Sequence, residues 1–161
     1  MSEVADYKLV RNSSVGSELT EEKAKILAAK LGVRRLKDGE LLVREGEADQ
    51  TLFILALGKL AVISKDVDGV DKHVYTMREG ECAGTRAFVE QSSRKATLRA
   101  LGDATVYMLT PTDFEALLDD NPRLAYLVMR ALFRVTHANL ARMNQETQEL
   151  TNYITKTQGR Y

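Results

Sequence analysis

The stretch Gly80–Leu98 holds the residue types and spacing best suited to chemistry in this chain. Glycines occur near its start, a short helix-like piece follows over Arg86–Glu90, and a polar loop ends in Arg94. A glycine followed by the first turn of a helix exposes backbone N–H groups that attract an anion. An arginine ten residues after Gly84 can return across the loop, and its planar guanidinium matches phosphate oxygens. The stretch therefore predicts an anion site.

The elements that must position this stretch are short β-favouring runs, which extend from Val33 to Leu109. Turn signals rich in glycine and aspartate separate them. The runs are Leu41–Arg44, Thr51–Ala56, Leu60–Lys65, Val70–Met77, Ala96–Ala100 and Thr105–Leu109. Thr20 predicts the N-cap of a short helix before them. The pattern indicates an α+β fold: an antiparallel β-roll or jelly-roll barrel with a short N-terminal helix and a long C-terminal helix.

The long helix is predicted to begin at Asn121-Pro122, after a short helix over Asp113–Asp120, and meets no Gly or Pro until Gly159. Two sets of residues recur along it every seven positions: Tyr126, Phe133, Leu140, Thr147 and Ile154, and, three positions further on, Met129, Thr136, Met143, Leu150 and Thr157. This is the spacing of a coiled-coil seam, so we expect a homodimer through this helix. The alternative is an ordinary amphipathic helix folded back on its own domain.

Composition and charge argue against several classes of function. Lys plus Arg equals Asp plus Glu, at 23 each, which favours neither nucleic acid nor an anionic membrane. The lone Cys82 excludes an intramolecular disulfide and a cysteine-cluster metal site, and neither His73 nor His137 has a ligand cluster nearby. We find no signal peptide, membrane span, nucleophile elbow, Walker loop or zinc-protease motif. We therefore expect a cytoplasmic protein that is not an enzyme and binds no metal.

The order of elements resembles the cyclic nucleotide-binding domain family, which includes the catabolite-activator-type bacterial regulators. The resemblance covers roughly Leu19 to Arg142 and is carried by several motifs. Leu42-Val43-Arg44-Glu45-Gly46 and the stretch Thr51–Leu60 resemble the family's first strands. Gly80-Glu81, Gly84 and Arg94-Lys95-Ala96-Thr97-Leu98-Arg99-Ala100 resemble its phosphate-binding cassette, with matching spacing from glycine to arginine.

The resemblance implies cyclic AMP or cyclic GMP as the ligand and no other cofactor. Arg94 would hold the cyclic phosphate, and Thr136 would contact the base. The candidate ligand-binding residues are Gly84, Thr85, Arg86, Ala87, Arg94, Lys95, Thr97 and Thr136. Two alternatives stay open: Arg94 as a surface salt-bridge residue near Glu90, and Thr136 as a residue of the helix seam.

Thr85 departs from the family pattern, which reads Phe-Gly-Glu where this chain has Ala83-Gly84-Thr85. In the family the glutamate accepts a hydrogen bond from the ribose 2′-hydroxyl. A hydrogen bond to a charged group is worth about 1.5–3 kcal/mol, so its loss would weaken cyclic nucleotide binding by tens of fold. Arg86 stands where the family has an apolar residue. Two alternatives stay open for it: an extra cation that favours a more highly charged ligand, or a solvated charge that simply faces water.

We therefore expect a stand-alone sensor of three parts: a flexible N-terminal segment 1–18, a cyclic-nucleotide-binding-type β-roll 19–120 and a dimerising helix 121–158. The sequence ends at Tyr161, directly after this helix, so we expect no helix-turn-helix and no direct DNA binding. Output would pass to a downstream protein partner. The alternatives are a degenerate domain that serves as a protein-interaction scaffold, or one that binds a cyclic dinucleotide.

Overall fold

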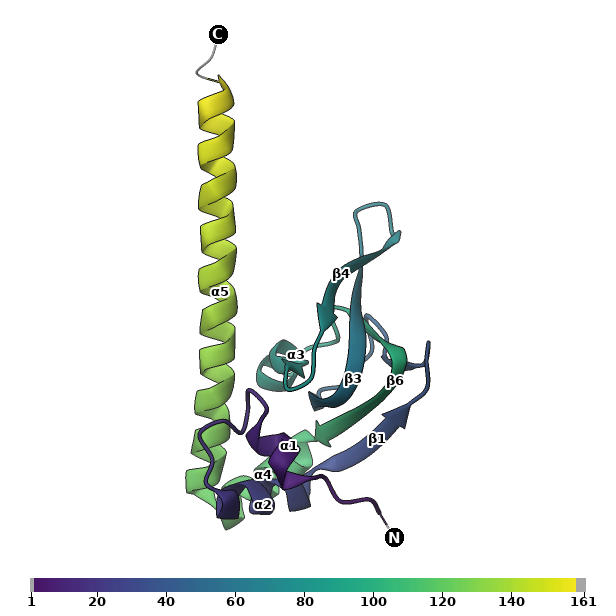
Figure 1. Ribbon diagram of the computed structural model, residues 1–161, viewed down its shortest axis with the longest axis vertical. Helices are drawn as coiled ribbons and strands as arrows, with labels where there is room; N and C mark the ends of the chain where they lie inside the picture. The colour runs from purple at the N-terminus through teal and green to yellow at the C-terminus, as the bar shows by residue number, and fades with distance from the viewer. Residues whose placement is uncertain (1, 159–161) are drawn as a thin grey trace.

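The computed structural model describes residues 2–158, in which an antiparallel sheet stands beside a group of helices (Figure 1). The helices are α1 (Tyr7–Arg11), α2 (Glu21–Lys30), α3 (Thr85–Glu90), α4 (Pro111–Asp120) and α5 (Pro122–Gln158). The strands are β1 (Gly32–Leu36), β2 (Leu41–Val43), β3 (Leu52–Lys65), β4 (Asp71–Met77), β5 (Cys82–Ala83) and β6 (Thr97–Leu109). The predicted α+β fold is confirmed, although its six strands in the described residues form an open sheet and not a closed barrel.

Two long strands, β3 and β6, form the centre of the sheet. The strand order is β1-β6-β3-β4, with β2 also pairing with β6 and β5 with β3. The sequence predicted two separate strands for each of the long ones, because Gly58 and Gly102 resemble turn residues. Each strand instead continues through its glycine, at φ of 89° and 74°. A Cβ on Gly58 would lie 2.4 Å from the carbonyl oxygen of Asp103, so the glycine lets the two strands cross closely where they bend.

Helices α2 and α4 begin at threonine caps and close one end of the sheet. The Oγ1 of Thr20 accepts a hydrogen bond from the backbone N–H of Lys23 at 3.3 Å, as the predicted N-cap requires. The Oγ1 of Thr110 accepts one from Asp113 at 3.1 Å. The apolar faces of these helices and of the start of α5 share one core with β3, which includes Leu27, Leu52, Leu117, Leu124 and Val128. A second core fills the inside of the roll and includes Phe53, Leu55, Leu60, Leu98 and Val106.

Much of the N-terminal segment, within residues 2–18, packs against the domain. Helix α1 lies there, and its Val10 is fully buried. The backbone N–H of Ser14 donates to the carbonyl oxygen of Gly80 at 2.8 Å, and Glu18 forms an ion pair with Arg134 of α5. Among the apolar residues of this otherwise polar segment, Ala5, Val10 and Val15 are buried in the core, while Val4 is exposed.

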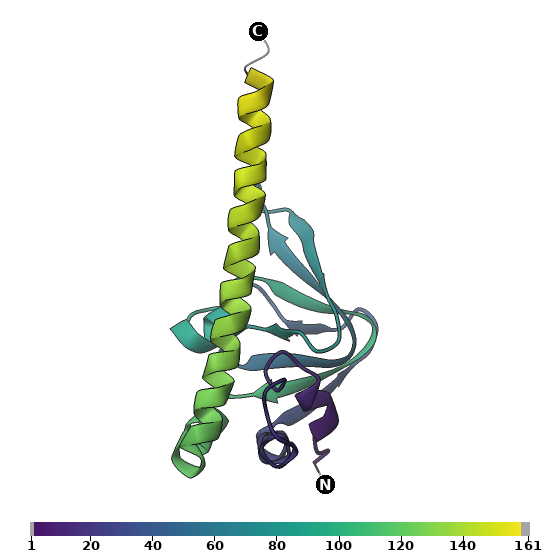
Figure 2. The same ribbon diagram turned by 60° about the vertical axis from the view of Figure 1, so that its left-hand side comes forward.

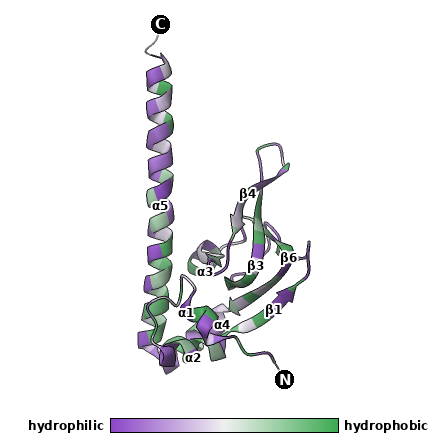
Figure 3. Ribbon diagram, viewed as in Figure 1, coloured by the Kyte–Doolittle hydropathy of each residue, from purple (hydrophilic) through white to green (hydrophobic). Residues whose placement is uncertain are grey.

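The two halves of helix α5 have different surroundings. Its buried residues all lie in the first half and are Leu124, Ala125, Val128, Ala131 and Leu132. The second half extends past the sheet without covering it (Figures 1 and 2). Apolar positions are interspersed among polar ones along this exposed half (Figure 3). Over residues 2–158, every helix is too short or too polar to cross a membrane.

Candidate functional site

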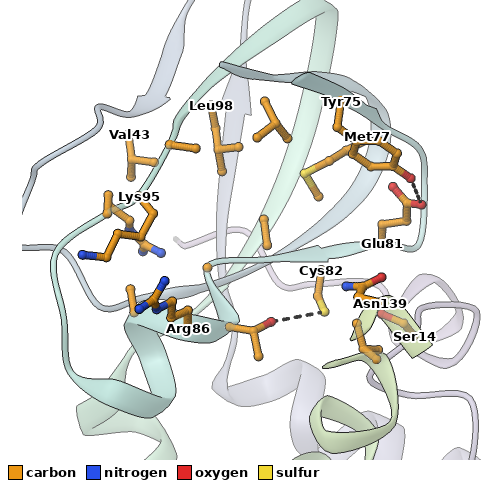
Figure 4. A pocket seen from close by; sticks show the side chains of 18 of the residues that line it. Ser14, Val43, Tyr75, Met77, Glu81, Cys82, Arg86, Lys95, Leu98 and Asn139 are labelled. Carbon is orange, nitrogen blue, oxygen red and sulfur yellow. Dashed lines mark hydrogen bonds between the residues drawn. The ribbon is translucent and has the colours of Figure 1, made fainter. Parts of the chain in front are cut away.

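A cavity of about 560 Å³ opens between the sheet and the middle of α5. Strands β2 to β6, helix α3, the loop after α3, the loop around Ser14 and one face of α5 all contribute to its lining (Figure 4). The volume falls within the range of small-molecule sites, about 300–1,000 Å³. The fold therefore brings together segments far apart in the sequence around a space large enough for a nucleotide.

Arg94 is the buried charge of this cavity, only 4% exposed. Its Nη2 donates to the carbonyl oxygen of Thr51 and lies 3.4 Å from Oδ1 of Asp49. The guanidinium carbon lies 4.6 Å from the centre of the Phe53 ring, a cation–π contact. Its Nε and Nη1 are buried and have no hydrogen-bond partner within residues 2–158. Because an unpaired buried donor is costly, an acceptor from outside the chain fits at this point.

Gly84 provides the space that the guanidinium occupies. It is the N-cap of α3 and has φ of 80°, a left-handed conformation that favours glycine. A Cβ on Gly84 would lie 2.1 Å from Nη1 of Arg94 and 2.9 Å from the carbonyl oxygen of Thr51. The predicted pairing of a glycine with an arginine ten residues later is therefore a direct contact.

The positive charge of Arg94 is only partly compensated by the protein. Burial acts to raise the pKa of Asp49, but hydrogen bonds from Thr51 and the charge of Arg94 outweigh it, so the pKa lies below its ordinary value. Burial lowers the pKa of Arg94, and Asp49 and Glu47 oppose that shift without cancelling it. A bound anion would favour the charged guanidinium and oppose the effect of burial.

Arg86 and Lys95 bring further positive charge to the same side of the cavity (Figure 4). The Nε of Arg86 donates to Oε2 of Glu90 at 2.9 Å, in an exposed i,i+4 pair. Lys95 is exposed and forms no ion pair with any residue between 2 and 158. The Oγ1 of Thr85 lies 3.9 Å from the sulfur of Cys82. We call this side the arginine wall, formed by Gly84, Thr85, Arg86, Ala87, Arg94 and Lys95.

Thr97 and Thr136, the other two candidates from the sequence, lie outside the cavity lining. The Oγ1 of Thr97 accepts a hydrogen bond from the backbone N–H of Glu45 at 2.9 Å, which ties β6 to the loop after β2. Thr136 is exposed, and its Oγ1 donates to the carbonyl oxygen of Leu132 at 2.9 Å. Both hydroxyls therefore form hydrogen bonds with backbone groups, and neither residue is part of the site proposed below.

A second wall comes from residues that sequence reasoning did not select. Helix α5 contributes Val135, Ala138, Asn139 and Arg142 to the lining, and we call this set the helix wall. Their spacing of i, i+3, i+4 and i+7 places them on one helix face. That spacing is a signal in the sequence, but the mixture of residue types gives no sign that the face borders a cavity.

Polar groups also line the cavity near the helix wall. The hydroxyl of Tyr75 donates to Oε1 of Glu81 at 2.5 Å (Figure 4). This hydrogen bond, together with burial and the negative charge of Glu81, raises the pKa of Tyr75. The Oγ of Ser14 is buried and lacks a hydrogen-bond partner among the described residues. Because that oxygen is closed off from the cavity, Tyr75 and Glu81 are the polar side chains that a ligand would meet at this end.

Comparisons with known proteins relate this chain to one family. The sequence profile of a family described as cyclic nucleotide-binding domain matches residues 33–121, more than half of the chain. Human cGMP-dependent protein kinase 2 is 32% identical over 93 residues, which are 56% of this chain and 12% of that protein. Lysophospholipase NTE1 of Mycosarcoma maydis is 25% identical over 113 residues, 70% of this chain and 6% of that enzyme.

The fold is also found among solved structures. A cyclic nucleotide-binding domain from Methylobacillus flagellatus matches with a TM-score of 0.81 at 16% identity, covering 91% of this chain and 86% of that one. At this identity the match establishes the fold alone. The curated relatives are much longer proteins, of which the chain spans 6% to 21% in the first matches.

Proposed function

This chain belongs to the cyclic nucleotide-binding domain family, and we propose that it is a regulatory module that binds a cyclic nucleotide in the cavity between its sheet and α5. Arg94 would hold the phosphate, assisted by the backbone at Gly84 and at the start of α3. The ligand would extend toward the helix wall, where Asn139 offers a polar contact.

One observation carries this proposal: two buried nitrogens of Arg94, Nε and Nη1, lack an acceptor within residues 2–158 and belong to a residue that lines an open cavity. Two hydrogen bonds from a guanidinium to an anion are the usual way of recognising a phosphate. A domain that serves only as a scaffold has no need to keep a charged group buried and incompletely paired, since burying a charge is costly.

We propose that the module itself is not an enzyme. Cyclic nucleotide-binding folds are regulatory, and the part of lysophospholipase NTE1 that this chain matches is 6% of that enzyme. The single free Cys82 fits a reducing compartment, so we propose a cytoplasmic location. Ligand occupancy would be passed on because α5 forms one wall of the cavity, and a ligand that contacts α5 differently in two positions shifts the balance between them.

The exposed half of α5 is proposed to pair with a second copy of the chain. Its apolar side chains Leu140, Met143, Leu150 and Ile154 are all about half exposed or more and follow the predicted seam. The helix has 37 residues and is therefore about 55 Å long at 1.5 Å per residue. Its second half extends beyond the rest of the domain (Figure 1). The same seam on a second copy of the helix would cover these four apolar side chains. Downstream partners would then contact the dimer.

Isothermal titration of the full chain with cyclic AMP and cyclic GMP tests the proposal. We expect binding, and we expect Arg94→Ala to weaken it by about 100-fold or more, since two hydrogen bonds from a charged group contribute about 3–6 kcal/mol. Arg123→Ala, which removes an exposed cation that does not line the cavity, is the matched control and should bind as the native protein does.

Two results would count against the proposal. Absence of heat with either nucleotide at millimolar concentration would favour the scaffold alternative. Equal affinity in Arg94→Ala, in a variant whose thermal unfolding shows that it is folded, would remove Arg94 from the site.

A further inference from the structure

The arginine wall carries more positive charge than a cyclic phosphate can balance, since Arg86, Arg94 and Lys95 all line it. The phosphate of a cyclic nucleotide is a diester with two terminal oxygens and one negative charge. Arg94 alone carries one positive charge, and its Nε and Nη1 are buried without a partner within residues 2–158. Every further charged donor on this wall would then add positive charge that the single negative charge of a cyclic phosphate leaves unbalanced.

Such further donors are present on Lys95 and Arg86. Lys95 has no ion-pair partner between residues 2 and 158, and Arg86 donates to Glu90 through Nε, which leaves its terminal nitrogens available. Figure 4 shows both side chains on the same side of the cavity. Because the Arg86–Glu90 pair is exposed, water screens it and it holds Arg86 only weakly.

Negative charge within the lining is confined to the far side of the cavity. Among the described residues Glu81 is the one acid in the lining, and both of its oxygens already accept hydrogen bonds, from Tyr75 at 2.5 Å and from the backbone N–H of Arg78 at 3.0 Å. Asp49 and Glu90 contact Arg94 and Arg86 from outside the lining. The surface that a phosphate would meet at the arginine wall is therefore strongly cationic.

We propose that this cavity binds an open-chain nucleoside monophosphate more tightly than the cyclic nucleotide of the same base. A phosphomonoester has three terminal oxygens and, with a second pKa of about 6, carries close to two negative charges at neutral pH. The third oxygen and the added charge are matched by Lys95, with Arg86 beside it. This inference rests on the proposed function, because Arg94 remains the group that anchors the phosphate.

The preference has a consequence for what the module senses. Water that opens a cyclic phosphodiester leaves a nucleoside monophosphate with the same base and sugar. A site that holds both ligands, and the product more firmly, responds to the balance between the cyclic nucleotide and its hydrolysis product. The two ligands differ in shape and charge at the phosphate, so their effects on α5 can also differ.

Titration of the full chain at pH 7.5 tests the inference directly. The ligands are the 3′- and 5′-monophosphates of adenosine and guanosine, cyclic AMP, cyclic GMP and the phosphate methyl ester of 5′-AMP. We expect at least one monophosphate to bind roughly tenfold more tightly than the cyclic nucleotide of its base, since a charge-assisted contact is added. The methyl ester is open-chain but has one charge and two terminal oxygens, so it should bind no better than cyclic AMP.

The variant Lys95→Ala identifies the residue responsible. We expect it to reduce the monophosphate preference to within about threefold while changing cyclic nucleotide affinity little, because only the monophosphate uses this charge. Lys59→Ala is the matched control, since Lys59 is exposed and lies outside the cavity lining. It should leave the preference unchanged.

The outcomes separate this inference from the proposed function. Cyclic nucleotides that bind as tightly as the monophosphates overturn the inference and leave the proposed function intact. A cyclic dinucleotide that binds more tightly than either class also overturns it, as does a preference that survives Lys95→Ala. If no nucleotide binds, the proposed function fails as well.

Discussion

The two walls of the cavity are built in different ways. On the arginine wall, Arg94 is buried and contacts Gly84, Thr51 and Phe53. On the helix wall, Val135 is half-buried and Ala138, Asn139 and Arg142 are exposed. The arginine wall is a preformed site held in place by the core. The helix wall consists of surface residues whose position depends on the orientation of α5 relative to the sheet. A ligand would therefore gain most of its binding affinity from contacts with the arginine wall. Its contacts with the helix wall would be the ones that change the orientation of α5.

The position of the helix wall depends on contacts that α5 makes before it reaches the cavity. The last fully buried residue of α5 is Leu132, and the ion pair between Arg134 and Glu18 joins α5 to the N-terminal segment just above it. Beyond this point, within the described residues, few contacts hold the helix against the body. Changes in the arginine wall should therefore have larger effects on binding than changes in the helix wall.

The largest effect is expected from Gly84→Ala. A Cβ at this position would lie 2.1 Å from Nη1 of Arg94, so the guanidinium must move out of its site. We expect nucleotide affinity to fall about 100-fold, as for loss of Arg94 itself, and the free energy of unfolding to fall by about 1–3 kcal/mol because the left-handed conformation is strained. Titration calorimetry and thermal unfolding measure the two effects.

Gly39→Ala separates backbone strain from loss of the site. Gly39 has φ of 81°, nearly that of Gly84, but a Cβ there would have no atom within 4 Å. This variant should lose about 1–2 kcal/mol of stability from the left-handed backbone and keep its nucleotide affinity. If Gly84→Ala binds as well as Gly39→Ala does, the contact between Gly84 and Arg94 has no part in binding.

The arginine wall was accessible to sequence reasoning because its geometry is local. Gly84, the first turn of α3 and Arg94 lie within eleven consecutive residues, and glycine and arginine have distinctive conformational and chemical properties. The partners of Arg94 were not predictable in the same way. Thr51 and Phe53 reach it only because β3 runs beneath the loop, which depends on sheet pairing.

The helix wall was missed for a related physical reason. The seam positions of α5 attracted attention because they are apolar at a seven-residue spacing, whereas Asn139 and Arg142 resemble ordinary solvated residues. Which face of a helix borders a cavity depends on how the helix is rotated, and that is set by the burial of Leu124, Val128 and Leu132. Thr136 illustrates the difference between the two faces, since it lies on the seam and outside the cavity lining.

Leu150→Asp tests whether the exposed seam of α5 joins two copies of the chain. Leu150 is 59% exposed, and burying a leucine on a partner contributes about 1.5–3 kcal/mol. A charge there should raise the dimer dissociation constant by at least tenfold in sedimentation experiments. Gln148→Asp, exposed and off the seam, is the control. Self-association that is unchanged in Leu150→Asp would exclude this seam as the interface.

The smallest effect is expected from Asn139→Ala on the helix wall, paired with Thr136→Ala on the seam face of the same turn. Asn139 lines the cavity, so its loss should weaken nucleotide binding by about threefold to tenfold, the value of one neutral hydrogen bond. Thr136 already donates to the carbonyl oxygen of Leu132, so its removal should leave affinity within about twofold.

The reverse ranking would change the comparison of the two walls. If Thr136→Ala weakens binding more than Asn139→Ala does, then α5 presents its seam to the ligand when the site is filled, which requires the helix to rotate about its axis. In that case the helix wall would form only when the ligand binds. The cavity and the seam would then be coupled by direct contact of the ligand with the seam, and not by a change in the orientation of α5.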